Sequence, residues 1–253
     1  MLTLAAGLIG SGLAACGGSS GSEKPATIEA PGLPASPNSA LTVPAPSPLE
    51  TGGATWAPVR RAVFARERPS RTANVVVRLA ARTPENTSNL VIVLGREQDA
   101  DGRIWVHARL PVLPNDKTGW IPREALGGYN VVHTHLVVDL KRLTATLLRD
   151  RRSIFRARIG VGKPAWPTPR GEFYIRNRLT DYESPFYGPL AFGTSARSAV
   201  LTDWPDGGFV GIHGTNQPEI LPGRVSHGCI RMRNEDILEL GRSMPIGTPV
   251  TIR

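Results

Sequence analysis

Short apolar runs separated by turn residues recur from residue 55 to the end of the chain, and this pattern constrains the fold most. Runs of this length, rich in Val, Ile and Leu and bounded by Pro, Gly, Asn or Asp, are typical of strands. In the second half they are Val131–Leu140, Thr144–Leu148, Ile154–Val161, Phe173–Ile175, Phe209–Ile212 and Thr248–Ile252. We therefore expect a mainly β chain in which residues 129–253 form a mostly antiparallel β-sandwich with one or two short helices.

One helix is predicted to begin near Asn234. Asn is a favourable N-cap residue, and acidic residues such as Glu235 and Asp236 suit the positive end of a helix dipole. The apolar stripe that follows consists of Ile237, Leu238, Leu240 and Met244. Pro245 is expected to end the helix, because proline cannot continue the backbone hydrogen bonding.

Residues 55–127 are predicted to form a separate small β domain. Along Ile104–Leu110 the side chains alternate between the two faces of a strand. The stretches GRIWVHARLP and KTGWIPREAL resemble segments of bacterial SH3-like modules, so we expect a small SH3-like β-barrel here. Such modules often bind cell-wall peptides, although simple packing against the neighbouring domain is the alternative.

Residues 1–15 predict a lipoprotein signal peptide. The apolar stretch from Leu2 to Leu13 is shorter than the about 20 residues of a membrane-spanning helix. Leu13-Ala14-Ala15-Cys16, followed by Gly and Ser, resembles a bacterial lipobox, which implies that Cys16 is lipidated. No Lys or Arg precedes Cys16, unlike the usual signal. An uncleaved apolar tail with an incidental cysteine is the alternative.

The segment that follows, residues 16–54, is predicted to be a lipidated cysteine and a disordered linker. Prolines recur from Pro25 to Pro48 among Ala, Ser and Thr, with almost no apolar periodicity. Such a segment cannot bury enough apolar surface to fold. We therefore expect an extracytoplasmic lipoprotein of the cell envelope, anchored to a membrane through Cys16.

Composition and charge exclude several classes of protein. The 253 residues include only two cysteines, which rules out a disulfide-dense scaffold and a cysteine-based zinc module. The net charge of +9 is spread over both predicted domains. Because no helix-turn-helix, RNA-binding aromatic signature or compact basic stripe accompanies it, we expect no nucleic-acid partner. A basic protein does suit an anionic polymer.

Cys229 has no disulfide partner if Cys16 is lipidated, and a lone cysteine in an oxidising compartment needs a function. His213 lies upstream, and a nearby imidazole is expected to lower the thiol pKa toward neutrality and so favour the nucleophilic thiolate. Gly228 permits backbone conformations that other residues avoid. The N–H groups of Gly228 and Cys229 are therefore expected to face a developing oxyanion. A buried structural thiol is the alternative.

These residues resemble the signature of the YkuD-type L,D-transpeptidase family. The signature combines His213 with the later run Ser226-His227-Gly228-Cys229. Further blocks agree with it in the right order along residues 129–253: Gly160–Gly162, Thr168–Ile175 and Ile246–Ile252. The resemblance implies the fold of this family for the second domain.

The resemblance also implies a role for each matching residue. Cys229 would be the nucleophile and His213 the general base, with the backbone carbonyl of Gly214 orienting the imidazole. His227 would shape the pocket, with a purely structural role as the alternative.

The remaining positions would serve the substrate. Ser226 and Gly228 would belong to the oxyanion and substrate site, and Arg231 would pair with a substrate carboxylate. The family uses no metal or cofactor. Zinc bound by His213, His227 and Cys229 is the alternative that the residue types alone allow.

The implied reaction is acyl transfer on peptidoglycan stem peptides. Cys229 would form a thioester with a stem tetrapeptide, release the terminal D-Ala and pass the acyl group to a diamino-acid amine, giving a 3→3 cross-link. Water as acceptor would make an L,D-carboxypeptidase, and a protein amine would attach that protein to peptidoglycan. A non-catalytic wall-binding protein is a further alternative. The family also implies acylation by carbapenem inhibitors.

Further predictions concern the aromatic residues near the motif and a pair of histidines. The aromatic segment from Leu179 to Ser198, which includes Tyr182, is expected to be a lid or wall over the site or else a packed connecting loop. Trp204 is expected to line the same cleft. His133 and His135, two apart in a strand, are expected to share one solvent-exposed face.

Overall fold

The computed structural model of the protein describes residues 53–180, 185–201 and 208–253. The chain divides into a unit of residues 1–40 and a unit of residues 41–253. The predicted signal peptide, Cys16 and nearly all of the predicted linker lie outside the described residues, as do Tyr182 and Trp204. Within the described ranges, no helix is both long and apolar enough to span a membrane.

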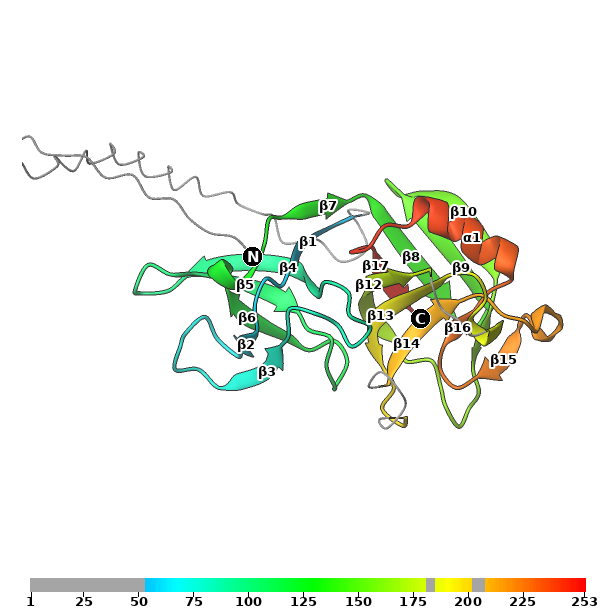
Figure 1. Ribbon diagram of the computed structural model, residues 1–253, viewed down its shortest axis with the longest axis horizontal. Helices are drawn as coiled ribbons and strands as arrows, with labels where there is room; N and C mark the ends of the chain where they lie inside the picture. Colours follow the sequence, from blue (N-terminus) through cyan, green and yellow to red (C-terminus); the bar gives the residue numbers. More distant parts are fainter. Residues whose placement is uncertain (1–52, 181–184, 202–207) are drawn as a thin grey trace, which may run out of the picture. The chain divides into compact units, whose positions relative to one another are not determined.

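A seven-stranded sheet is formed by the first part of the described chain (Figure 1). Its strand order is β3-β2-β6-β5-β4-β1-β7, and neighbouring strands are antiparallel. The strands are β1 (Ala54–Pro58), β2 (Val63–Arg66), β3 (Val75–Leu79), β4 (Leu90–Gln98), β5 (Ile104–Arg109), β6 (Thr118–Pro122) and β7 (Asn130–Val132), with the 3-10 turn η1 (Arg123–Ala125) before β7. Its strands share a buried apolar core that includes Val91, Val106 and Ile121.

A ten-stranded sheet follows, in the order β10-β9-β8-β17-β12-β13-β14-β16-β11-β15. Its strands are β8 (Thr134–Asp139), β9 (Thr144–Arg149), β10 (Arg152–Arg158), β11 (Gly160–Gly162), β12 (Gly171–Leu179), β13 (Ala191–Arg197), β14 (Phe209–His213), β15 (Gly223–Ser226), β16 (Ile230–Arg231) and β17 (Pro249–Ile252). The 3-10 turns η2 (Pro185–Tyr187) and η4 (Pro218–Ile220) interrupt the connections. Most neighbours are antiparallel, but β8–β17, β11–β15 and β14–β16 are parallel.

The helix α1 (Asn234–Ser243) packs beside β10 (Figure 1). Its buried residues Ile237 and Leu240 join the core that the ten strands share with Leu136, Phe173 and Ile212. Burial of such side chains is the main favourable contribution to folding, at about 1.5–3 kcal/mol each. By burying Ile237 and Leu240 in this core, α1 anchors the part of the chain that follows β16.

The mainly β prediction and the helix predicted near Asn234 are confirmed for the described residues. Three details were wrong or missed. Arg233, not Asn234, is the N-cap residue, and no side chain caps α1. Part of the segment predicted as a lid or loop is strand β13. Both of its faces are buried or partly buried, but its small and polar Gly, Thr and Ser residues give no apolar run that would reveal a strand. The short β15 and β16 carry too few residues for a pattern to reveal them.

His135 is also not where the sequence predicted it. His133 is exposed, but His135 is 5% exposed and its Nε2 lies 2.8 Å from Oγ1 of Thr251. The two histidines do not share a strand face, because His133 lies between β7 and β8 and only His135 belongs to β8. Burial lowers the pKa of His135, so the hydrogen bond to Thr251 holds a neutral imidazole.

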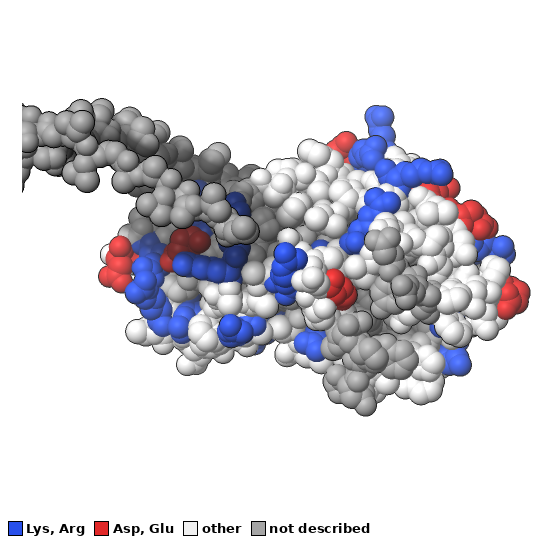
Figure 2. Space-filling model, viewed as in Figure 1, with Lys and Arg blue, Asp and Glu red and all other residues white. Residues whose placement is uncertain are grey.

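Lys and Arg side chains lie over both sheets on the face drawn in Figure 2, as the sequence predicted, rather than along one strand or loop. This distribution gives the described surface a general positive character.

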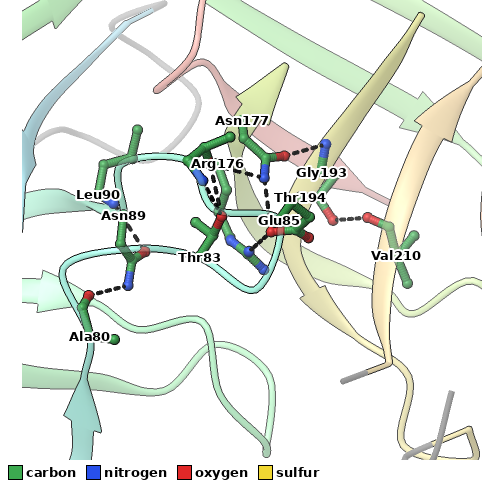
Figure 3. A network of polar contacts seen from close by, with 11 residues as sticks. Ala80, Thr83, Glu85, Asn89, Leu90, Arg176, Asn177, Gly193, Thr194 and Val210 are labelled. Atoms are coloured by element: carbon green, nitrogen blue, oxygen red, sulfur yellow. Dashed lines mark hydrogen bonds and ion pairs between the residues drawn. The ribbon is translucent and has the colours of Figure 1, made fainter. Parts of the chain in front are cut away.

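A buried polar network joins the two sheets (Figure 3). Oε2 of Glu85, from the loop before β4, accepts from Nη2 of Arg176 and from Nδ2 of Asn177, each at 3.0 Å. The side chains of Arg176 and Glu85 are 1% and 12% exposed. Oδ1 of Asn177 in turn accepts from the N–H of Gly193 on β13. A loop of the first sheet is thereby tied to β12 and β13 of the second.

Glu85→Ala is expected to lower the free energy of unfolding by about 3–5 kcal/mol, because it leaves the buried Arg176 guanidinium without its counter-charge. Urea unfolding monitored by tryptophan fluorescence measures this change. Glu97→Ala, which removes an exposed carboxylate from the same sheet, is the control and is expected to change the value by less than about 0.5 kcal/mol. Equal losses in the two variants would contradict a structural role for the Glu85 network.

Candidate active site

The parallel neighbours β14 and β16 bring the two halves of the sequence motif together. Ile212 pairs with Ile230 and His213 with Arg231, so His213 ends one strand while Cys229 immediately precedes the other. A Cβ added to Gly211 would lie 3.8 Å from both Sγ of Cys229 and Cδ2 of His213. The thiol and the imidazole therefore face the same small space across Gly211.

Cys229 is partly exposed, and its Sγ accepts the N–H of Gly211 at 3.4 Å. The turn before it is fixed by Ser226, whose Oγ donates to the Cys229 carbonyl at 2.6 Å and accepts the N–H of Gly228 at 3.1 Å. Gly228 has φ of +118°, a conformation that other residues rarely adopt. Ser226 and Gly228 thus set the direction in which Cys229 presents its thiol.

One of the two expected oxyanion donors is already used. Because the N–H of Gly228 donates to Ser226, it does not face a substrate as predicted. The N–H of Cys229 is the one that remains of the predicted pair.

Thr168 holds the same turn from the opposite side. Its hydroxyl donates to the Gly228 carbonyl at 2.7 Å and accepts the N–H of Gly162 at 2.9 Å. Thr168 is 5% exposed, so no water replaces these contacts. The sequence placed Thr168 in a family block but gave no signal of this contact, because residues 168 and 228 are 60 positions apart.

Thr168→Val is expected to destabilise the protein by about 2 kcal/mol, since it leaves a buried N–H and a buried carbonyl without partners. Thermal unfolding measures the change, and Thr168→Ser, which keeps the hydroxyl, should lose much less. If Val and Ser variants unfold alike, the hydroxyl does not hold the turn.

His213 is fixed by a backbone carbonyl. Its Nδ1 lies 2.6 Å from the carbonyl oxygen of Gly214, and the residue is 3% exposed. A carbonyl can only accept, so Nδ1 carries the proton and Nε2 is left as an acceptor. Burial lowers the pKa of His213 to about 4, against the opposing effect of the Gly214 hydrogen bond. The neutral imidazole is therefore ready to accept a proton throughout the physiological range.

The Tyr187 ring packs on this imidazole. The ring centroids are 4.7 Å apart and the ring planes are tilted by 56°. The aromatic contact excludes water from one face of His213 and adds to the orientation that the Gly214 carbonyl provides.

The pKa of the Cys229 thiol is shifted in the opposite direction from the sequence prediction. Burial raises it, and this effect exceeds the lowering by the N–H of Gly211 and by the charge of Arg231. His213 supplies no positive charge, because it is neutral at pH 7. The resting pair is thus a thiol beside a neutral imidazole rather than a thiolate beside an imidazolium.

The rate of Cys229 alkylation by iodoacetamide is therefore expected to keep rising with pH from roughly 6 to 9, because only the thiolate reacts. Mass spectrometry of samples quenched at timed intervals follows the alkylation, and a Cys16→Ser variant leaves Cys229 as the one thiol that reacts. A rate that is already level between roughly pH 5 and 8 would show a thiolate–imidazolium pair and contradict this electrostatic account.

His227 and Arg231 complete the set of predicted residues. His227 is exposed and its ring lies 4.4 Å from that of Trp166. Nε of Arg231 is buried and has no hydrogen-bond partner within the described part of the chain. Because Arg231 also lines the cavity beside Cys229, its guanidinium is a candidate anchor for an anion.

These predicted residues line one cavity of about 280 Å³, apart from Gly214 and Gly228, which are not among its lining residues. The lining consists of Phe186, Tyr187, Ser198, Leu201, Gly208, Phe209, Val210, His213, Ser226, His227, Cys229 and Arg231. The described part of the predicted lid, in Phe186, Tyr187 and Ser198, contributes to this wall. Among the described residues, no three His, Cys, Asp or Glu side chains are placed to hold a metal ion.

Comparison with known proteins decides the family. Residues 133–252 match the family model of the YkuD L,D-transpeptidase catalytic domain. The chain is 35% identical over 159 residues to the YkuD protein of Bacillus subtilis, whose name assigns it to the L,D-transpeptidases; the match covers 60% of this chain and 89% of that protein. The chain belongs to the YkuD L,D-transpeptidase family.

Further comparisons also find proteins named as L,D-transpeptidases. The YkuD protein of Bacillus licheniformis is 39% identical over 117 residues, covering 46% of this chain and 64% of that protein. Among solved structures, a cysteine-to-serine mutant of the Enterococcus faecium L,D-transpeptidase is 30% identical, with a TM-score of 0.38 over 48% of this chain and 50% of that one. The chain spans about half the length of the first solved structures it matches.

In this family member, loops of the first sheet also contact residues that pack against the cavity wall. The guanidinium groups of Arg176 and Arg197 each contact the Phe209 ring, at 3.6 and 4.9 Å from the ring centroid. Arg176 is held by Glu85, and the Arg197 backbone exchanges two hydrogen bonds with the Asn115 side chain. Two loops of the seven-stranded sheet therefore support one side of the site.

Proposed function

We propose that the protein is a peptidoglycan L,D-transpeptidase with Cys229 as nucleophile and His213 as general base. Its assignment to the family supports the general activity. The observation that supports the chemistry is the placement of the Cys229 thiol and an Nδ1-protonated His213 around Gly211. The family resemblance supplies the substrate class, the stem tetrapeptide.

In the acylation step, Nε2 of His213 accepts the thiol proton as Sγ attacks the carbonyl that joins the third stem residue to the terminal D-Ala. The new S–C bond gives a tetrahedral oxyanion, which the N–H of Cys229 is positioned to stabilise. The C–N bond then breaks, and the imidazolium returns the proton to the departing D-Ala amine. The product is a thioester on Cys229 with His213 neutral again.

In the second step an amine of another stem peptide attacks the thioester. His213 takes a proton from this amine and returns it to Sγ as the S–C bond breaks. The new amide is a 3→3 cross-link. The Gly214 carbonyl keeps Nδ1 protonated in both steps, so that Nε2 is always the nitrogen that exchanges the proton.

Arg231 is proposed to bind a carboxylate of the donor stem. It lines the cavity beside Cys229, and its buried Nε lacks a partner among the described residues. His227 is proposed to form part of the same wall through its contact with Trp166. Among its described lining residues the cavity then presents the Arg231 cation beside polar serines and several aromatic and apolar side chains, which fits a peptide with a charged end.

The proposal also includes a membrane anchor, a spacer, an SH3-like module and inhibition by carbapenems. Lipidation of Cys16 would anchor the enzyme at a membrane of the cell envelope, the segment up to residue 54 would act as a spacer, and residues 55–127 would be an SH3-like module. Carbapenems are proposed to acylate Cys229, since an activated β-lactam carbonyl can take the place of the stem carbonyl.

Purified protein incubated with disaccharide-tetrapeptide is expected to release D-Ala and to form 3→3 dimers. Cys229→Ala and His213→Ala should each slow D-Ala release by at least about 1,000-fold, because each removes a member of a unit that works together. Mass spectrometry of the muropeptides measures both products. His133→Ala, which removes an exposed histidine away from the cavity, is the matched control and should retain activity.

The products distinguish the acceptors. Tripeptide monomers without dimers would identify water as the acceptor and make the protein an L,D-carboxypeptidase by the same site. No D-Ala release by the wild-type chain, or equal release by Cys229→Ala, would contradict the proposed function.

A further inference from the structure

The side chain of Asn234 does not cap the helix that it begins. Arg233 is the N-cap residue of α1, and no side chain bonds to the first turn. Oδ1 of Asn234 instead accepts the N–H of Thr215 at 3.0 Å, 19 positions earlier in the chain. Asn often caps the helix that it begins, but here the Asn234 side chain bonds to the loop that follows His213 instead.

That N–H belongs to the peptide unit that orients the base. The carbonyl of Gly214 and the N–H of Thr215 lie in one planar trans peptide and point in opposite directions. The carbonyl accepts from Nδ1 of His213 at 2.6 Å, while the N–H donates to Asn234. The peptide is therefore held at both ends, and its rotation would disturb both bonds together.

The packing around this peptide admits the Asn234 amide only because two residues have no side chain. A Cβ on Gly214 or on Gly188 would collide with Oδ1 of Asn234. Gly188 also has φ of +65°, which favours glycine. Thr215 is 2% exposed, so water cannot readily replace Asn234 as the acceptor for its N–H. Three separate segments of the chain meet to hold one peptide unit.

We propose that Asn234 is the positioning residue of the general base, acting through the Gly214–Thr215 peptide. The inference rests on the proposed function and extends it from His213 to α1. Without the Oδ1 acceptor, the buried N–H of Thr215 must seek another partner, and the peptide rotates. The carbonyl then leaves Nδ1, and the tautomer that carries its proton on Nε2 becomes populated. That tautomer cannot accept the Cys229 proton.

The test compares Asn234→Ala with Asn234→Asp, which keeps a carboxylate oxygen where Oδ1 stands. Nitrogen-15 NMR of labelled histidine at pH 7 reports the His213 tautomer, and absorbance at the β-lactam band follows acylation by meropenem. Asn234→Ala is expected to mix the two tautomers and to slow acylation by roughly 10- to 100-fold, the size of effect that small misplacements produce. Asn234→Asp should restore the Nδ1-protonated tautomer and most of the rate.

Two controls separate positioning from folding. Glu235→Ala removes an exposed side chain from the same helical turn and should change neither readout. If Asn234→Ala fails to fold, Asn234→Leu fills the same space without an acceptor and should show the same mixture of tautomers. A rate loss that Asn234→Asp shares, with the tautomer unchanged, would show a merely structural role and overturn the inference.

The outcome for this inference is separable from that for the proposed function. If meropenem does not acylate the wild-type chain, the proposed function fails, while the NMR comparison still reports whether Asn234 fixes the His213 tautomer. If Asn234→Ala shows the wild-type tautomer and the wild-type acylation rate, the inference is wrong even though the enzyme is active.

Discussion

The parallel pairing of β14 with β16 is the constraint on which the rest of the site depends. These strands share only the pairs Ile212–Ile230 and His213–Arg231, yet this contact sets His213, the proposed base, beside Cys229, the proposed nucleophile. Ile212 and Ile230 are fully buried in the core to which α1 also contributes. The hydrophobic core therefore fixes the separation of two catalytic candidates through the strands that carry them, and the loops that follow need only orient the side chains.

Orientation is supplied by backbone groups that buried or partly buried side chains hold in place. Ser226 and Thr168 fix the turn before Cys229, and Asn234 holds the peptide that fixes His213. Burial, rather than a charged partner, keeps the imidazole neutral and the thiol protonated at rest. In the proposed mechanism, proton transfer then accompanies attack on the substrate. A site of this kind depends on the precise fit of its loops more than on a strong local charge.

The sequence predicted the residues of the candidate site better than the contacts that hold them in place. His213 and Cys229 were predicted because nucleophile and base occur in a short, specific motif, and the strands around them because β-branched runs are local signals. The role of Thr168, the burial of His135 and the contact of Asn234 with Thr215 depend on long-range pairing, which no local pattern encodes. The thiol pKa was predicted in the wrong direction, since burial is a property of the fold and outweighed the expected effect of a nearby histidine.

The most direct test of the central claim is the mass of the enzyme trapped during turnover with a stem tetrapeptide and no acceptor amine. The account predicts an adduct equal to the donor minus D-Ala, lost on treatment with hydroxylamine and mapped by peptide digestion to Cys229. An adduct on another residue, or D-Ala release without any covalent intermediate, would contradict it.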